Sequence, residues 1–179
     1  MLGRPKFRVI HGLRFVNEYL QEVKFQRQSL KRCEPLLKSG WFMTAADLES
    51  GYSHLSVKEG DRTFLGFKHR GVYYEMCTLP FGLSSAPEAF TRLTKTMVRR
   101  WRSRGWIVRH CLDDVGFLAE TKEGAEAMIR QAFADVRELG FGCNLAKCET
   151  VGSNFMRFLG LIVDLRQGSG SPSSARRSW

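Results

Sequence analysis

The sequence predicts an α+β domain built on an antiparallel sheet with two helices on one face. Two segments with helical periodicity, 88–104 and 122–139, alternate with short β-like runs. When the insertion at 55–79 is set aside, the order is strand, helix, hairpin, helix, strand, which is the split β-α-β order of ferredoxin-like folds. The length of 179 residues suits one well-buried core.

Both predicted helices have recognisable ends. In the first, apolar residues recur on one side and basic residues occupy the other, with Pro87 in the first turn and Gly105 after the last. The second has Thr121 as its expected N-cap and Gly140 as its stop. A third helix is expected at about 28–38.

The predicted strands are shorter than the helices, and two of them form a hairpin. The runs 106–112 and 115–119 are separated by Asp113 and Asp114, which predicts a hairpin with its turn at this acidic pair. A further hairpin is expected in the insertion, turning at 68–71. The remaining strands are expected at 41–48 and at 155–163, the latter closing the sheet.

The charge of the chain favours a polyanionic partner. There are 28 Lys and Arg against 18 Asp and Glu, a net charge of +10, and the excess lies in residues 1–38 and 89–112. Nucleic acid ranks ahead of a membrane as the partner, and no apolar run is long enough to span a bilayer. The alternative is that each basic block is a solvated helix face.

Cysteine usage and the ends of the chain suggest a cellular setting. The five cysteines include no C-x-x-C pair, which favours reduced thiols over a disulfide framework or a zinc site. The first residues lack the apolar segment of a secretory signal. An intracellular protein of the cytoplasm or nucleus is therefore expected. Residues 167–179 are rich in Gly, Ser and Pro and predict a disordered tail.

Three carboxylates are expected to meet at one end of the predicted sheet. Asp47 ends the first strand, which in this topology lies beside the hairpin that carries Asp113 and Asp114. Like charges held this close are tolerable mainly when divalent cations neutralise them. Two Mg²⁺ ions about 4 Å apart would support phosphoryl transfer. The alternative is that Asp113 and Asp114 form only a local turn, in which such residues are common.

Four motifs, in order along the chain, carry a resemblance to a known family. They are Ala46-Asp47-Leu48-Glu49-Ser50-Gly51-Tyr52, LPFGLSSAP at 79–87, Cys111-Leu112-Asp113-Asp114 and Phe158-Leu159-Gly160. Over about residues 5–164 the chain resembles the reverse transcriptase domain of retroelements. The second motif, together with the basic residues 100–105, is most similar to DIRS-type retrotransposons, with the gypsy type next.

The resemblance implies an RNA-directed DNA polymerase. Such an enzyme transfers nucleotides from dNTPs to a primer 3′-hydroxyl on an RNA or DNA template-primer, with two Mg²⁺ ions or, alternatively, Mn²⁺. A catalytically inactive retroelement remnant that binds RNA or RNA–DNA duplex is the alternative. The family has a thumb after the palm, whereas this sequence changes to the Gly- and Ser-rich tail after Asp164, so a chain truncated after the palm is expected.

The resemblance also implies a division of the chain. A polymerase palm of ferredoxin-like or RRM-like topology is expected at 41–56 and 80–165. Fingers elements are expected at 1–40 and 57–79, and the tail at 166–179.

The resemblance assigns roles to individual residues. Asp47, Asp113 and Asp114 are the catalytic metal ligands, and Lys147 is a candidate general acid for the pyrophosphate leaving group. The expected nucleotide-binding residues are Arg8, Leu48 through its carbonyl, Tyr52, Phe81 and Gly82. The expected primer and template contacts are Cys111, Leu112, Phe158, Leu159, Gly160, Arg92, Lys95 and Arg99.

Three of these residues carry a qualification. Tyr52 matches an aromatic ring beneath the incoming sugar that excludes a 2′-hydroxyl, but its alternative is a core tyrosine. The alternative for Lys147 is a solvated surface lysine. Cys111 departs from the family, because a tyrosine is usual at this position.

Overall fold

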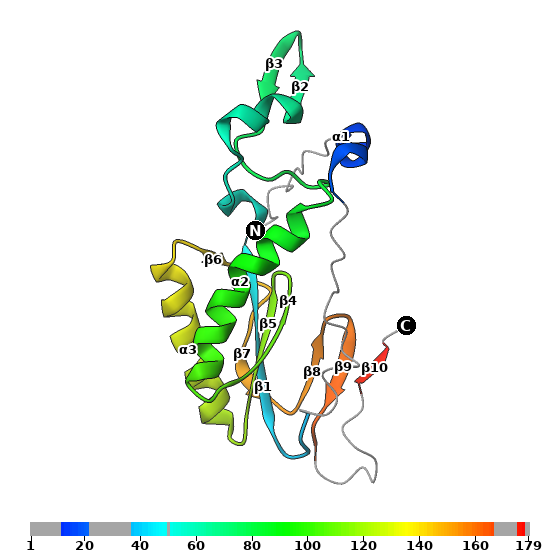
Figure 1. Cartoon of the computed structure of the whole chain (residues 1–179). Helices are drawn as coiled ribbons and strands as arrows, with labels where there is room; N and C mark the ends of the chain where they lie inside the picture. The colour runs from blue at the N-terminus through cyan, green and yellow to red at the C-terminus, as the bar shows by residue number, and fades with distance from the viewer. Residues whose placement is uncertain (1–11, 22–36, 50, 167–174, 178–179) are drawn as a thin grey trace. The chain divides into compact units, whose positions relative to one another are not determined.

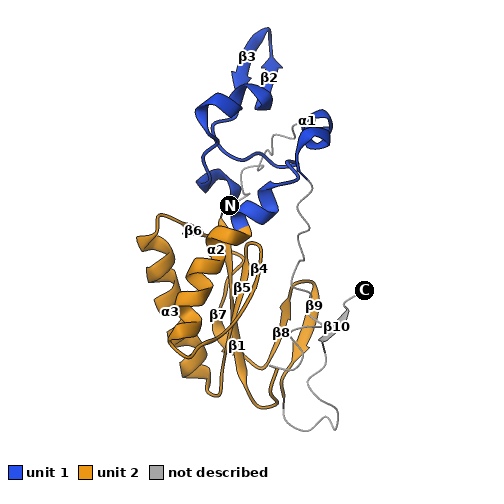
Figure 2. Ribbon diagram, viewed as in Figure 1, with its two compact units in different colours: residues 1–25, 52–90 blue, residues 26–51, 91–179 orange. Residues whose placement is uncertain are grey.

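The structure is a computed structural model that describes residues 12–21, 37–49, 51–166 and 175–177 (Figure 1). Arg8 and most of the helix expected at 28–38 therefore lie outside the described residues, and Leu37 and Lys38 are not helical. The chain forms two compact units, residues 1–25 with 52–90 and residues 26–51 with 91–179 (Figure 2).

The larger unit is built on a five-stranded antiparallel sheet in which β1 is central. One edge of β1 pairs with β5, which pairs in turn with β4, and the other edge pairs with β6 and β7. The strands are β1 (Phe42–Glu49), β4 (Ile107–Cys111), β5 (Asp114–Ala119), β6 (Gly142–Cys143) and β7 (Glu149–Ser153).

Two long helices cover one face of this sheet, as the sequence predicts (Figure 1). They are α2 (Ala86–Ser103), of which residues 91–103 belong to this unit, and α3 (Lys122–Glu138). The hydroxyl of Thr44 on β1 donates a hydrogen bond to the carbonyl of Ala125 on α3. The Trp101 ring of α2 packs edge-on against the Phe117 ring of β5, with centroids 5.3 Å apart. The α+β prediction is confirmed.

The expected helix signals are present in the structure. Thr121 accepts a hydrogen bond through its side chain from the Gly124 amide at 3.1 Å, so it is the N-cap of α3. Gly105 and Gly140 follow the two helices with φ of +81° and +80°, a conformation that glycine adopts without a Cβ penalty.

A β-hairpin packs on the other face of the sheet. It consists of β8 (Phe155–Phe158) and β9 (Leu161–Asp164), and its buried residues Met156, Phe158 and Val163 form one cluster with Met43, Ala45 and Leu118 of the sheet. Gly116 on β5 makes room for this packing, because a Cβ at that position would meet Met43 Cε and the Phe158 ring.

This hairpin corrects the expectation of a closing strand at 155–163. Leu159 and Gly160 have left-handed φ values of +52° and +74°, so they turn the chain back on itself. The last strand of the main sheet is instead β7, whose pairing with β1 shifts register between Met43 and Ala45. The strand, helix, hairpin, helix, strand order is retained, but a different segment supplies the last strand.

The C-terminal segment also differs from its prediction. Residues Ala175–Arg177 form β10, which pairs antiparallel with β9. The expectation of disorder is therefore wrong for these three residues, and 167–174 and 178–179 lie outside the described part of the chain.

The smaller unit consists of short elements around a small apolar core. They are α1 (Arg14–Tyr19), η3 (Gly51–His54, whose first residue belongs to the larger unit), η4 (Glu59–Leu65), β2 (Gly66–His69) and β3 (Val72–Glu75). Arg70 and Gly71 turn the β2–β3 hairpin with φ of +50° and +84°, which confirms the hairpin predicted there. The core residues are Leu13, Val57, Leu65, Leu83 and Ala86. Among the described helices of the chain, none combines the length and apolar character needed to cross a membrane.

Candidate active site

Asp47 and Asp114 are direct partners across β1 and β5. Residues that face each other in an antiparallel pair have Cβ atoms about 5 Å apart on the same side of the sheet. Asp113 immediately precedes Asp114, and its carbonyl accepts a hydrogen bond from the Leu48 amide at 2.8 Å. The fold therefore brings the three predicted carboxylate residues to one end of the sheet.

The turn of the β4–β5 hairpin lies one residue earlier than predicted. Leu112 and Asp113 form the turn, Leu112 has a left-handed φ of +58°, and Asp114 is already part of β5. The sequence prediction of a turn at Asp113 and Asp114 is therefore wrong for Asp114. This shift matters because it makes Asp114 a ladder partner of Asp47.

The carboxylates project from the sheet face that is opposite the helices. Side chains alternate along a strand, and Thr44 faces α3, so Met43, Ala45 and Asp47 point to the other face. The β8–β9 hairpin covers Met43 and Ala45 on this same face. The predicted primer contacts Phe158, Leu159 and Gly160 thus lie on the carboxylate side of the sheet.

Burial and repulsion by neighbouring carboxylates disfavour the ionised form of Asp114 at this end of the sheet. Burial, together with the negative charges of Asp113 and Asp47, raises the pKa of Asp114 to about 6. One positive group opposes this effect, because Lys147 Nζ lies 3.2 Å from Asp47 Oδ2. The Lys147 side chain is 59% exposed, whereas that of Asp47 is 12% exposed. An ion pair therefore places the predicted general acid, Lys147, against Asp47.

The segment that carries Lys147 also holds the backbone of Asp47. The Asn144 amide donates to the Asp47 carbonyl at 2.9 Å, and the Asp47 amide donates to Cys148 Sγ at 3.4 Å. Cys143 pairs with Leu48 across β6 and β1, and burial raises the pKa of its thiol to about 11, so it remains protonated. Sequence reasoning missed Asn144, Cys143 and Cys148 as neighbours of Asp47, and their only signal was their proximity to Lys147.

His110 is a further residue that sequence reasoning missed. It is 5% exposed, and its Nε2 donates a hydrogen bond to the Leu112 carbonyl at 2.8 Å. Burial lowers the pKa of His110 to about 4, and the nearby Arg102 and Lys95 act in the same direction. A neutral imidazole therefore holds the turn next to Asp113.

Cys111, the residue that stands where a tyrosine is usual, pairs with Asp114 and is half-buried.

The predicted nucleotide-binding residues of the smaller unit come together within that unit. The Tyr52 ring packs edge-on against Phe81, with centroids 5.2 Å apart, and against Phe90 at 5.7 Å. Phe81 is 46% exposed. Gly82 has φ of +96°, a conformation that requires glycine at this turn.

The basic residues predicted to contact nucleic acid share one side of α2. Arg92, Lys95 and Arg99 are exposed, while Met97, Val98 and Trp101 are buried. The helix contains no acidic residue after Glu88, so its exposed side is positive along most of its length.

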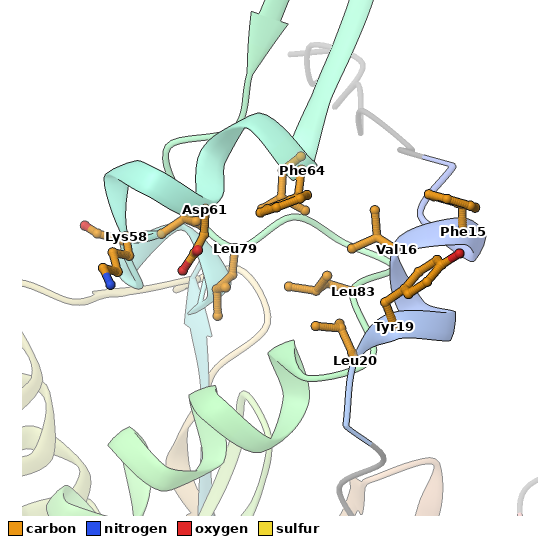
Figure 3. Close-up of a pocket in the computed structure, with 12 residues that line it drawn as sticks. Phe15, Val16, Tyr19, Leu20, Lys58, Asp61, Phe64, Leu79 and Leu83 are labelled. Carbon is orange, nitrogen blue, oxygen red and sulfur yellow. The ribbon is translucent and has the colours of Figure 1, made fainter.

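An apolar cavity of about 750 Å³ lies in the smaller unit (Figure 3). It is bounded by α1 and η4, with Leu79 and Leu83 on its wall, and Lys58 and Asp61 contribute the charged groups of its lining. None of the described candidate site residues lines it.

Within the described ranges, no group of three or more His, Cys, Asp and Glu side chains is arranged so that it could hold a metal ion. The oxygen donors that the fold places face to face are the two carboxylates of Asp47 and Asp114.

Comparisons with known proteins identify the family of the chain. Residues 4–163 match the family model described as reverse transcriptase (RNA-dependent DNA polymerase). The chain is 32% identical over 120 residues to a Pol polyprotein from the transposon gypsy of Drosophila melanogaster, covering 67% of this chain and 11% of the relative. It is 26% identical over 170 residues to a genome polyprotein of Petunia vein clearing virus, covering 95% and 8%. The chain thus spans about a tenth of the length of these relatives.

Solved structures show the same fold. The native protease-reverse transcriptase of prototype foamy virus matches with a TM-score of 0.73 at 20% identity, over 86% of this chain and 20% of that one. A foamy viral protease-reverse transcriptase in complex with RNA/DNA hybrid matches with a TM-score of 0.71 at 19% identity, over the same shares. The relatives include Pol polyproteins of the gypsy, 297 and opus transposons, and the ranking of the DIRS type first stays a prediction. The chain belongs to the reverse transcriptase (RNA-dependent DNA polymerase) family.

Proposed function

We propose that the chain is the catalytic part of a reverse transcriptase that extends a DNA primer on an RNA or DNA template with dNTPs. The observation that carries the proposal is the ladder pairing of Asp47 with Asp114, with Asp113 adjacent, inside a chain that belongs to this family. Foamy viral relatives of the same fold bind RNA/DNA hybrid and double-stranded DNA. Nucleic acids and dNTPs are intracellular substrates, so the cytoplasm or nucleus is the proposed location.

In this proposal the chain divides into a palm and fingers, with bounds that differ from those of the two compact units. The palm comprises 41–56 and 80–165, and the fingers elements comprise 1–40 and 57–79. The support is the antiparallel sheet, which has helices on one face and presents the carboxylates on the opposite face.

Reverse transcriptases generally use divalent metal ions, and the donor set of this chain fits Mg²⁺. Mg²⁺ binds through one or two carboxylates and completes its shell with water and substrate phosphates. Asp47 and Asp114 supply such a pair. Burial and the repulsion from Asp113 and Asp47 raise the pKa of Asp114, and a bound cation would oppose both effects. We assign the metals to Asp47, Asp114 and Asp113, with the Leu48 carbonyl as a further ligand and Mn²⁺ as the alternative ion. Two such ions, when bound, would polarise the primer 3′-hydroxyl and stabilise charge on the α-phosphate and pyrophosphate.

Several further residues of the chain have proposed roles in handling the reactants. Lys147, held against Asp47, supplies an ammonium proton or positive charge to the departing pyrophosphate. Tyr52 restricts the space for a 2′-hydroxyl, and Phe81 and Gly82 contact the incoming nucleotide. Arg8 is assigned to the triphosphate, because a guanidinium suits bidentate phosphate contacts.

The nucleic acid would contact two surfaces. The exposed side of α2, with Arg92, Lys95 and Arg99, suits the phosphate backbone of the template. The primer end is assigned to Cys111 and Leu112 and to the β8–β9 turn at 158–160, which lies on the carboxylate side of the sheet.

Primer extension by the full chain tests the proposal. We expect Mg²⁺-dependent incorporation of dNTPs by the wild type and a loss of at least about a hundredfold in Asp114→Asn. The matched control is Asp61→Asn, an exposed aspartate of the smaller unit, which should keep its activity. An inactive wild type, or an active Asp113→Asn/Asp114→Asn double variant, would contradict the proposal.

A further inference from the structure

We propose that Asn17 is a positioning residue that holds the loop 81–84 in the conformation needed to bind the incoming nucleotide. The inference rests on the proposed function, because it takes Phe81 and Gly82 as residues that meet the nucleotide. Asn17 lies on α1, far from this loop in sequence, and its side chain forms two hydrogen bonds with the loop.

The two hydrogen bonds are reciprocal. Asn17 Nδ2 donates to the carbonyl of Gly82 at 2.9 Å, and Asn17 Oδ1 accepts from the amide of Ser84 at 2.9 Å. The side-chain amide therefore binds the peptide groups on both sides of Leu83, in the way that a neighbouring strand would. Both bonds are made to backbone groups, so they fix the path of the loop whatever its side chains are.

Asparagine is the side chain that this position requires. A carboxylate accepts but does not donate, so aspartate would lose the bond to the Gly82 carbonyl and place a negative charge beside it. Alanine would lose both bonds. Asn17 is half-buried, and its backbone amide donates to the carbonyl of Leu13 at 2.9 Å within the first turn of α1. Leu13 belongs to the core of the unit and Val16 packs against it, so the Asn17 side chain projects from a helix that is packed on the core.

The loop depends on these bonds because its functional residues are exposed. Leu83 is buried and Ala86 is completely so, whereas Phe81 is 46% exposed and Gly82 is exposed. Burial of Leu83 fixes where the loop is anchored but not the rotation of the peptide groups around it. Gly82, with φ of +96°, has the widest conformational choice. The Asn17 amide removes this freedom at the point where Phe81 meets Tyr52.

Steady-state incorporation of a single dNTP by the full chain tests the inference. In Asn17→Ala and Asn17→Asp we expect the KM for dNTP to rise about tenfold, which matches the loss of one or two hydrogen bonds. The kcat should stay within about threefold, and the affinity for template-primer should not change. Glu18→Gln, an exposed neighbour on α1, is the matched control and should behave as the wild type.

A second measurement separates positioning from folding. Hydrogen exchange at the amides of 82–86 should accelerate about tenfold in Asn17→Ala but not in Glu18→Gln. A residue that only stabilises the fold would reduce the fraction of active enzyme, and therefore kcat, without raising KM. An unchanged KM in both Asn17 variants, or unchanged exchange, would overturn the inference while the proposed function stands. A wild type without incorporation would instead contradict the proposed function and the nucleotide role together.

Discussion

Trp101 on α2 donates a hydrogen bond from its indole Nε1 to Asp135 Oδ2 on α3, at 2.8 Å, and both residues are buried. Arg104 donates to the same carboxylate at 2.6 Å, and Gln131 donates at 3.2 Å. Burial alone would raise the pKa of Asp135, but these hydrogen bonds outweigh it and the pKa is lowered. The two helices behind the carboxylate-bearing sheet are thus joined by one ionised side chain.

Removal of this carboxylate should destabilise the larger unit. Asp135→Ala leaves the Trp101 indole and the Arg104 guanidinium without their acceptor, and we expect the free energy of unfolding to fall by about 3 kcal/mol. Urea denaturation followed by tryptophan fluorescence measures this change. Arg130→Ala, which removes the exposed partner of Glu126 from a 3.9 Å ion pair, should change the free energy of unfolding by less than about 0.5 kcal/mol. Equal effects of the two variants would refute the role of Asp135.

The stability of the chain should fall in mild acid because of His110. Its pKa is lowered from 6.5 to about 4 in the folded protein, so the unfolded chain binds more protons between these values. The contribution is therefore complete above about pH 6.5 and is lost progressively down to pH 4. Its size is on the order of 3 kcal/mol.

Urea denaturation of His110→Gln at several pH values checks this prediction. Glutamine can still donate to the Leu112 carbonyl but does not titrate, so the slope of stability against pH should flatten between pH 4 and 6.5. His69→Gln, at an exposed position of β2, should leave the slope unchanged. A His110→Gln slope identical to that of the wild type would show that another group is responsible.

Lys147 should affect the chemical step more than the fold. Lys147→Gln removes the ammonium group 3.2 Å from Asp47, and we expect kcat to fall by about a hundredfold, as for the loss of a general acid. The loss of a competing cation should also tighten Mn²⁺ binding by up to about fivefold. Rapid-quench incorporation and a Mn²⁺ titration measure the two effects.

The control for Lys147 is another exposed lysine of the same unit. Lys122→Gln at the start of α3 should change neither quantity. If Lys147→Gln retains its full rate, Lys147 is only a surface partner of Asp47, the alternative that the sequence left open.

The exposed side of α2 should determine the salt dependence of nucleic-acid binding. Replacement of Arg92, Lys95 and Arg99 by alanine should reduce the slope of log affinity against log salt concentration by about 2 to 3, one unit per phosphate contact. Fluorescence anisotropy with a labelled template-primer at several salt concentrations measures the slope. Replacement of Lys122, Arg130 and Arg137 on α3 by alanine removes the same charge and should leave this slope unchanged. Equal losses in both triple variants would indicate that only net charge matters.

The helices and turns of this protein could be predicted from its sequence, because interactions between residues close in the chain determine them. The helices α2 and α3 were predictable because apolar periodicity, Thr121 and the terminal glycines all act within one or two turns. The turns of both predicted hairpins were found to within a residue for the same reason. The four ordered motifs were enough to indicate the family, and the predicted strand order was enough to place Asp47 beside the hairpin that carries Asp113 and Asp114.

Only the tertiary structure determined the strand pairings and side-chain contacts between residues that are distant in sequence. The segment 149–153 shows little apolar alternation and becomes the closing strand only through its pairing with β1. The segment 155–163 forms a hairpin instead, because Leu159 and Gly160 reverse the direction of the chain. The contacts of Asp47 with Lys147 and of Asn17 with Gly82 join residues 100 and 65 positions apart. Local propensity cannot predict such pairs. A side-chain hydrogen bond forms only where the packed backbone brings a donor and an acceptor within about 3 Å of each other.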